Sequence, residues 1–193
     1  MSAFLSRASF VVPAMVAVAM AVGAPVGFTA SEALAAGSSS KPTKDATKCK
    51  RGQVYSKRQK KCVDDESAGL TNEDRYETGR SLALVGRFED AILVLETADR
   101  SDPRVLNYLG YSSRNAGRME EGMAYYEAAL EIDPRFALAR SYMGQALLQQ
   151  GDRDGAEEQL ALVGEISGED SAEYAQLRDA LQGKAGGYGY GYR

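Results

Sequence analysis

Apolar and small residues recur in the second half of the chain in a pattern that predicts pairs of helices. Two stretches share a large apolar residue next to Gly and a second Gly seven positions later. They are Leu109-Gly110 with Gly117, and Met143-Gly144 with Gly151, which follows at a distance of 34 residues. The second Gly stands where a helix must stop in a left-handed conformation that only Gly adopts at low cost. The pattern therefore predicts helix-turn-helix units that recur at a fixed period.

Polar residues predict where these helices begin. Thr71 with Asp74 has the spacing of a capping box, in which a hydroxyl and a carboxylate three positions apart satisfy the first backbone N–H groups. Asp102-Pro103 and Asp133-Pro134 each place a capping carboxylate before a Pro at the first helical position. We therefore expect the helical region to start at residue 71, with further helices starting at residues 103 and 134.

The pattern also predicts the first and the last helices of the region. Gly86 ends the first helix, but it lies 31 residues before Gly117, so we expect a tightened loop at 99–102. After residue 170, Tyr174 and Leu177 begin an amphipathic pattern that ends at Gly183. The expected total is seven helices, of which the last covers the apolar face of the third pair.

The order of these residues resembles the tetratricopeptide repeat family. The resemblance implies an all-α solenoid over 71–183, with three helix-turn-helix repeats and a C-terminal capping helix. It also implies a concave groove, lined by the first helix of each repeat, that holds an extended peptide or a partner helix. The positions that match this groove are Tyr76, Arg80, Asn107, Tyr111, Arg114, Asn115, Ser141, Gln145 and Gln149.

At some positions the residue has an alternative role or departs from the family pattern. Tyr108 and Tyr142 also fall on the groove side, and we interpret them as packing residues between helices. Gly122 stands where the family usually has Ala, in the second helix of the middle repeat. We interpret it as a tolerated substitution, and a functional kink is the alternative. The residues of the family's chaperone-docking clamp are not matched, so the resemblance does not imply that role.

The charge is distributed unevenly along the chain. Residues 41–62 carry nine basic side chains and one acidic side chain, a net charge of +8, whereas residues 63–183 have a net charge of −14. Such an asymmetry favours an interaction with an anionic partner, and the alternative is a solubilising segment that folds back on the acidic repeats. The basic loop over 49–62 and its approach contain Lys48, Lys50, Arg51, Lys57, Arg58, Lys60 and Lys61.

Cys49 and Cys62 are the two cysteines of the chain, and they enclose this basic loop. In an exported protein an even pair at this spacing predicts one structural disulfide. A metal site would need about four ligands, and the chain has no His to supply them. A reactive thiol pair would need a motif that this spacing does not provide.

The two ends of the chain have the composition of segments outside the folded region. Residues 1–35 combine Arg7, an uncharged apolar run and Ala33-Leu34-Ala35, which predicts a signal peptide and a periplasmic or secreted protein with no transmembrane span after cleavage. Residues 36–48 predict a flexible linker. The Gly/Tyr-rich tail over 184–193 is interpreted as disordered, and stacking on sugars or aromatic groups is the alternative.

The chemistry of the chain argues against an enzyme. It has no His, no glycine-rich phosphate loop and no cluster of metal ligands, so we expect no cofactor and no metal. We predict a non-enzymatic adaptor that binds a protein or peptide in the groove, in the setting of envelope assembly. The alternative function is an envelope surface protein that binds polysaccharide or anionic lipid through the basic loop and the Tyr-Gly tail. Nucleic acid is not an expected partner outside the cytoplasm.

Overall fold

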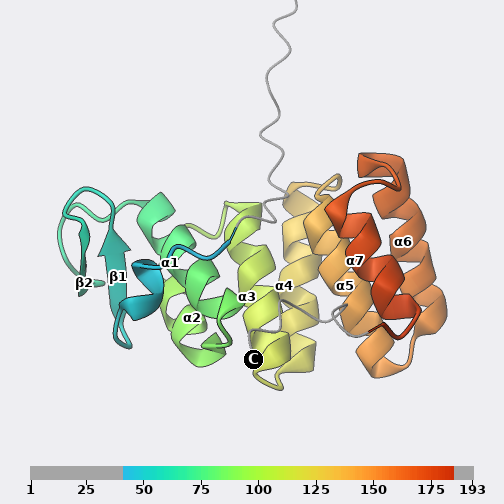
Figure 1. The fold of residues 1–193 in the computed structure, drawn as a ribbon, viewed down its shortest axis with the longest axis horizontal. Coiled ribbons are helices and arrows are strands. Elements are labelled where there is room, and N and C mark those ends of the chain that lie inside the picture. The colour runs from blue at the N-terminus through green and yellow to red at the C-terminus, as the bar shows by residue number, and fades with distance from the viewer. Residues whose placement is uncertain (1–40, 185–193) are drawn as a thin grey trace, which may run out of the picture. The chain divides into compact units, whose positions relative to one another are not determined.

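The computed structural model describes residues 41–184, and it contains one short 3₁₀ helix, two strands and seven α-helices there (Figure 1). The predicted signal peptide, the first part of the predicted linker and residues 185–193 lie outside the described residues. In chain order the elements are η1 (Ala46–Lys48), β1 (Gln53–Ser56), β2 (Lys61–Asp64), α1 (Asn72–Leu84), α2 (Phe88–Leu95), α3 (Pro103–Asn115), α4 (Met119–Ile132), α5 (Ala137–Gln150), α6 (Arg153–Ser167) and α7 (Ala172–Leu181).

The helices form three consecutive pairs and a final single helix. Within each pair the two helices pack together, as α1 with α2, α3 with α4 and α5 with α6. The first helices of successive pairs also contact one another, so α1, α3 and α5 form a continuous layer. The last helix, α7, packs against both α5 and α6. This arrangement confirms the prediction of three helix-turn-helix repeats with a capping helix.

The helix ends follow the predicted turn and cap residues, with one exception. Gly86, Gly117 and Gly151 have φ angles of 81°, 85° and 86°, so the left-handed turn recurs in every repeat. Thr71 forms the predicted capping box with Asp74, and Asp102 caps α3 by accepting from the backbone N–H of Arg104. The start predicted at residue 134 is wrong.

Asp133-Pro134 lies between two helices instead of starting one. Asp133 follows the last residue of α4, and its backbone N–H still donates to the carbonyl of Ala129. Its carboxylate accepts from the backbone N–H of Arg135, which forms a turn, and α5 begins only at Ala137. An Asp-Pro pair therefore serves here as a turn after one helix, because Asp stabilises both structures by the same kind of hydrogen bond.

The shorter spacing of the first repeat is explained mainly by its second helix. α2 has 8 residues, whereas α4 has 14 and α6 has 15. A turn forms at the predicted position, because Asp99 accepts from both the backbone N–H and the hydroxyl of Ser101. The connection as a whole is longer rather than tightened, since residues 96–102 separate α2 from α3 whereas residues 133–136 separate α4 from α5. The shorter spacing therefore comes from α2, and the expectation of a tightened loop as its cause is wrong.

Two glycines allow α3 and α4 to approach closely. A Cβ atom at Gly122 would lie 3.0 Å from the carbonyl oxygen of Gly110 and 3.0 Å from the backbone nitrogen of Arg114. A Cβ atom at Gly110 would lie 2.7 Å from the ring of Tyr126, which is fully buried. A side chain at Gly122 would therefore be crowded by the backbone of α3, which gives this glycine a packing role that the interpretation as a tolerated substitution did not include.

A β-hairpin precedes the repeats, and it was not predicted from the sequence pattern. Its strands pair antiparallel from Gln53 opposite Asp64 to Ser56 opposite Lys61. The expected disulfide between Cys49 and Cys62 is present in the structure. It connects β2 to the residue that follows η1, so the basic loop and η1 form one folded unit, which we call the knob (residues 41–64).

None of the α-helices in residues 41–184 has the length and apolarity needed to cross a membrane.

Candidate functional site

Six of the nine groove residues predicted from the sequence come together on the layer formed by α1, α3 and α5. We call this layer the inner face, and its aromatic part is a chain of tyrosine rings. The centroids of Tyr76 and Tyr108 are 6.0 Å apart, and those of Tyr108 and Tyr142 are 6.3 Å apart. Tyr111 completes the group at 5.0 Å from Tyr142. Edge-to-face and tilted contacts of this kind connect all three repeats through their first helices.

The tyrosines of the inner face keep their hydroxyl protons. Burial raises the pKa of Tyr108, Tyr111 and Tyr142 above the ordinary tyrosine value. At neutral pH these hydroxyl groups are therefore uncharged and can both donate and accept hydrogen bonds. The inner face therefore contains uncharged hydroxyl groups among its buried aromatic rings.

Three arginines lie against these rings. The guanidinium carbon of Arg104 is 4.3 Å from the centroid of Tyr76, and that of Arg114 is 5.6 Å from the centroid of Tyr111. The guanidinium carbon of Arg80 lies 5.8 Å from the centroid of Tyr108. Arg104 is held by Asp102, whose hydrogen bond raises the pKa of the guanidinium further, and by Glu73. The inner face therefore has a positive charge that its tyrosines partly stabilise.

Arg114 has hydrogen-bonding capacity that the fold does not use. The residue is 4% exposed, and its Nη1 donates to the backbone carbonyl of Tyr142 at 2.9 Å. Its Nε and Nη2 atoms have no hydrogen-bond partner, and within residues 41–184 no carboxylate forms an ion pair with it. A buried cation without a counterion is costly, so Arg114 is available for an acceptor from a ligand.

Two neighbouring side-chain amides also lack hydrogen-bond partners. Asn107 on α3 and Gln145 on α5 are fully buried, and both the nitrogen and the oxygen of each side-chain amide lack partners. Each amide could donate one hydrogen bond and accept another, which is the pattern that an extended peptide backbone presents. Buried polar groups are normally paired, so these atoms require an explanation.

The remaining predicted groove residues have other surroundings. The hydroxyl of Ser141 donates to the backbone carbonyl of Glu173 at 2.8 Å, and this bond fixes α7 to α5. The amide of Asn115 donates to the carbonyl of Tyr111 one turn earlier, and Gln149 is exposed. The structure therefore brings Tyr76, Arg80, Asn107, Tyr111, Arg114 and Gln145 together, and it uses Ser141 and Asn115 in bonds within the fold.

Sequence reasoning did not single out Tyr126 as a site residue. Tyr126 lies on α4, its ring centroid is 6.5 Å from that of Tyr142, and its buried hydroxyl has no partner. An aromatic residue in the second helix of a repeat is typical of packing, which the structure shows, but no sequence signal indicates the unpaired hydroxyl.

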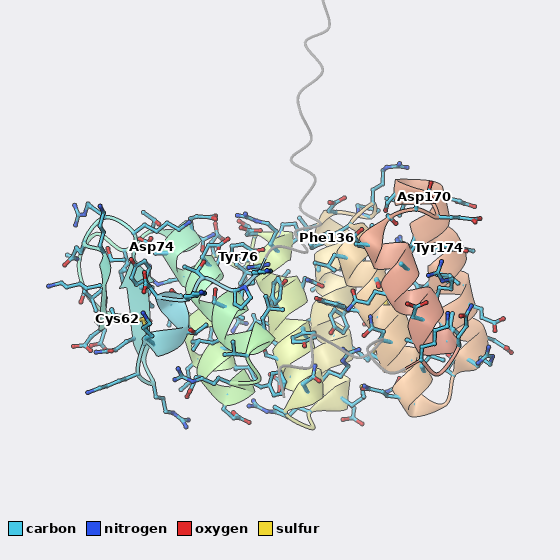
Figure 2. The ribbon with its side chains drawn as sticks, viewed as in Figure 1. Cys62, Asp74, Tyr76, Phe136, Asp170 and Tyr174 are labelled. Carbon is cyan, nitrogen blue, oxygen red and sulfur yellow. A yellow bond between two sulfur atoms is a disulfide. The ribbon has the colours of Figure 1, made fainter. Side chains whose placement is uncertain are left out.

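A second candidate surface is the cleft between α6 and α7. It has a volume of about 730 Å³, and both apolar and charged residues line it, among them Leu160, Tyr174, Arg178 and Glu157. Figure 2 shows Tyr174 at the α6–α7 end of the repeats, far from Cys62. The cleft contains no buried polar atom without a partner, in contrast to the inner face.

The side chains of the described part of the chain contain no group of three or more candidate metal ligands.

Comparison with known proteins supports the architecture. A family model described as a tetratricopeptide repeat matches residues 114–181. The type III secretion translocator chaperone SycD of Yersinia enterocolitica is 22% identical and has a TM-score of 0.51, and the match covers 58% of this chain and 88% of that chain. PcrH, in complex with the chaperone binding region of PopB, is also 22% identical with a TM-score of 0.51, and the match covers 58% of this chain and 98% of that chain. Among curated proteins, none matches this chain. At this level of identity the solved structures establish the fold alone.

Proposed function

We propose, from the tetratricopeptide repeats that this chain carries, that it is an adaptor that binds a peptide segment of another protein along α1, α3 and α5. The repeats provide a stacked scaffold whose first helices present side chains on one common layer. Binding is the activity that such a scaffold supports, and the structure of PcrH in complex with the chaperone binding region of PopB agrees with this class of function.

The main support for this proposal is the set of buried polar atoms on the inner face that have no hydrogen-bond partner. Arg114, Asn107 and Gln145 together leave six side-chain nitrogen or oxygen atoms buried without a partner. A peptide backbone would supply carbonyl groups to the guanidinium and both donors and acceptors to the amides. The tyrosine rings beside them would contact the side chains of the peptide, and Tyr and Arg are common energetic anchors of interfaces.

The burial of these atoms predicts how binding proceeds. Because they are covered in the structure, a peptide can reach them only after the inner face opens. We therefore expect binding to be slower than simple docking on a preformed groove, since an opening step precedes contact.

The setting that we propose is the envelope of a bacterium. The predicted signal peptide and the disulfide of the knob support an exported protein, because disulfides persist in oxidising compartments. Envelope assembly is the task that an exported adaptor of this kind would serve.

Selection from a random peptide library tests the proposed site. Peptides that bind the native chain are titrated by calorimetry against three proteins: the native chain, Arg114→Met and the matched control Arg135→Met. Arg135 is exposed and lies on the turn before α5, so its loss removes the same charge away from the inner face. We expect Arg114→Met to weaken binding at least tenfold, as for loss of a charge-assisted hydrogen bond, and Arg135→Met to leave it unchanged. Equal binding by all three proteins would disprove the assignment.

A further inference from the structure

The knob is the most strongly charged part of the described chain, and the adaptor function does not use it. Residues 41–62 have a net charge of +8, and all nine basic side chains in this range are exposed. They are Lys41, Lys44, Lys48, Lys50, Arg51, Lys57, Arg58, Lys60 and Lys61. The rest of the described chain is acidic, so the positive charge is concentrated at one end of the repeats.

The structure shows that the knob is fixed to the first repeat. The carboxylate of Asp74 accepts from the backbone N–H of Lys57 at 3.1 Å, and the hydroxyl of Thr78 accepts from the backbone N–H of Tyr55 at 3.0 Å. These two α1 side chains therefore occupy the outer edge of β1. Figure 2 shows Asp74 and Cys62 together at the hairpin side of the repeats.

Further bonds secure η1 and the loop after it. Arg87, at the start of α2, donates through Nη1 to the backbone carbonyls of Thr47 at 3.0 Å and Cys49 at 2.7 Å. The hydroxyl of Ser81 accepts from the backbone N–H of Thr43 at 3.0 Å. Residues 43–48, which the sequence predicted to be part of a flexible linker, are therefore held against the first repeat. The basic side chains are displayed on a rigid support, because most of these bonds involve the backbone of the knob.

Most of the positive charge of the knob is not neutralised. Within the described residues, three of its nine basic residues form ion pairs: Lys48 with Asp45, Arg51 with Asp90 and Lys57 with Glu73. The last two pairs have N···O distances of 3.9 and 3.8 Å, and both basic partners are more than half exposed. Exposed ion pairs of this kind are weak, so they leave the positive electrostatic potential of the knob largely unchanged. The segment does fold back on the first repeat, as the alternative interpretation expected, but this contact leaves most of its positive charge unpaired.

We propose that the knob is a peripheral membrane-binding surface that attaches the chain to anionic phospholipid headgroups. The basic groups are mainly lysines, which act as hydrated point charges and suit a diffuse layer of lipid headgroups. The large exposed apolar residues of the described chain are Val85, Leu93 and Ile132, and none of them belongs to the knob. Attachment is therefore electrostatic, without insertion into the hydrocarbon layer.

The charge distribution also predicts the orientation of the bound protein. The knob faces the membrane, while the acidic repeats are repelled by the same surface. Because α1 holds the knob directly, the repeats are presented at a fixed angle instead of on a flexible tether. The inner face remains available for a protein partner in this orientation, but the attachment itself is independent of peptide binding.

Co-sedimentation with vesicles tests this proposal. The full chain is mixed with phosphatidylcholine vesicles that contain or lack phosphatidylglycerol, at low and at high salt. The test variant is Lys57→Gln/Lys60→Gln/Lys61→Gln. The control variant, Arg135→Gln/Arg153→Gln/Lys184→Gln, removes the same charge from exposed positions outside the knob.

We expect the native chain to bind only the vesicles with phosphatidylglycerol and to be released by salt. The test variant should bind on the order of 100-fold more weakly, from the contribution of each lysine near an anionic surface. The control variant should bind as the native chain does. Circular dichroism of both variants verifies that they are folded.

Three results would overturn the proposal. The first is no difference between the two kinds of vesicle, and the second is equal binding by the test and the control variant. The third is retention by an acidic polysaccharide, polygalacturonate, at a salt concentration that abolishes vesicle binding, which would assign the knob to a carbohydrate. A selected peptide is also titrated against each variant. Because the inner face is unchanged in all of them, peptide binding should be the same, so a failure of the membrane proposal can be distinguished from a failure of the adaptor function.

Discussion

Arg114 on α3 donates a 2.9 Å hydrogen bond to the backbone carbonyl of Tyr142 on α5, and this bond connects the second repeat to the third. The same guanidinium has two further nitrogen atoms that are buried without partners. Arg114 therefore both contributes to the packing of the repeats and leaves donors for a ligand.

The first prediction concerns the stability of Arg114→Met. The substitution removes one hydrogen bond, but it also removes a buried cation without a counterion, and these two effects oppose each other. We expect the free energy of unfolding to change by less than about 2 kcal/mol in denaturant titration. A loss of more than about 4 kcal/mol would show that the guanidinium is mainly a structural group.

The second prediction concerns the contact between α3 and α4. Gly122→Ala places a methyl group 3.0 Å from two backbone atoms, which cannot move as a flexible side chain can. We expect a loss of about 1–3 kcal/mol, as for overpacking, measured as a lower melting temperature. Gly164→Ala on α6 is the control, because its nearest neighbour is the Tyr174 ring at 3.2 Å and we expect a smaller effect. An unchanged or higher melting temperature for Gly122→Ala would contradict the close approach.

The third prediction concerns the disulfide of the knob. It joins residues separated by 13 positions, so it restricts a short loop of the unfolded chain. We expect Cys49→Ser/Cys62→Ser to destabilise the knob by about 3 kcal/mol, measured as faster amide hydrogen exchange in residues 43–64. The exchange of α5 and α6 should stay the same, because they do not contact the knob. Equal effects in both regions would contradict a local role.

The fourth prediction concerns pH and Asp74. Burial alone would raise the pKa of Asp74, but the backbone hydrogen bonds from Lys57 and Thr71 outweigh it, so its pKa lies below the ordinary aspartate value. The carboxylate therefore stabilises the folded state above the aspartate pKa of about 4, and this contribution is lost as the pH falls through the lower folded value.

The variant Asp74→Asn gives the matching test. We expect it to destabilise the native chain at neutral pH by about 1–3 kcal/mol, because one amide oxygen replaces a charged acceptor of two backbone N–H groups. Melting temperatures measured between neutral and acidic pH should then fall less steeply for Asp74→Asn than for the native chain. Parallel pH curves for the two proteins would refute the role of Asp74.

The repeat architecture could be predicted from the sequence because its signals are local. A positive φ after a helix strongly favours Gly, so Gly86, Gly117 and Gly151 indicate the turns without any knowledge of the tertiary structure. The capping box of Thr71 and Asp74 is equally local. The Asp133-Pro134 pair gave a wrong prediction because Asp stabilises a turn and a helix start by similar hydrogen bonds to the backbone.

The knob and the details of the inner face could not be predicted in this way. Each strand of the hairpin has four residues, which is too short for an alternating pattern, and the pairing is stabilised by α1 side chains more than 15 residues away. The burial of Arg114 depends on Tyr142, which is 28 residues later in the chain. The sequence could therefore predict which residues lie on the inner face, but it could not predict which of their polar atoms lack a hydrogen-bond partner.

Photo-cross-linking of a selected peptide to the native chain shows directly whether the peptide lies on the inner face. A benzophenone amino acid is placed at successive positions of the peptide, and the cross-linked residues of the chain are identified by mass spectrometry. We expect cross-links to α1, α3 and α5, within residues 76–80, 107–114 and 142–145, and their loss in Arg114→Met. Cross-links confined to the cleft between α6 and α7, or to the knob, would contradict the inner face as the binding site.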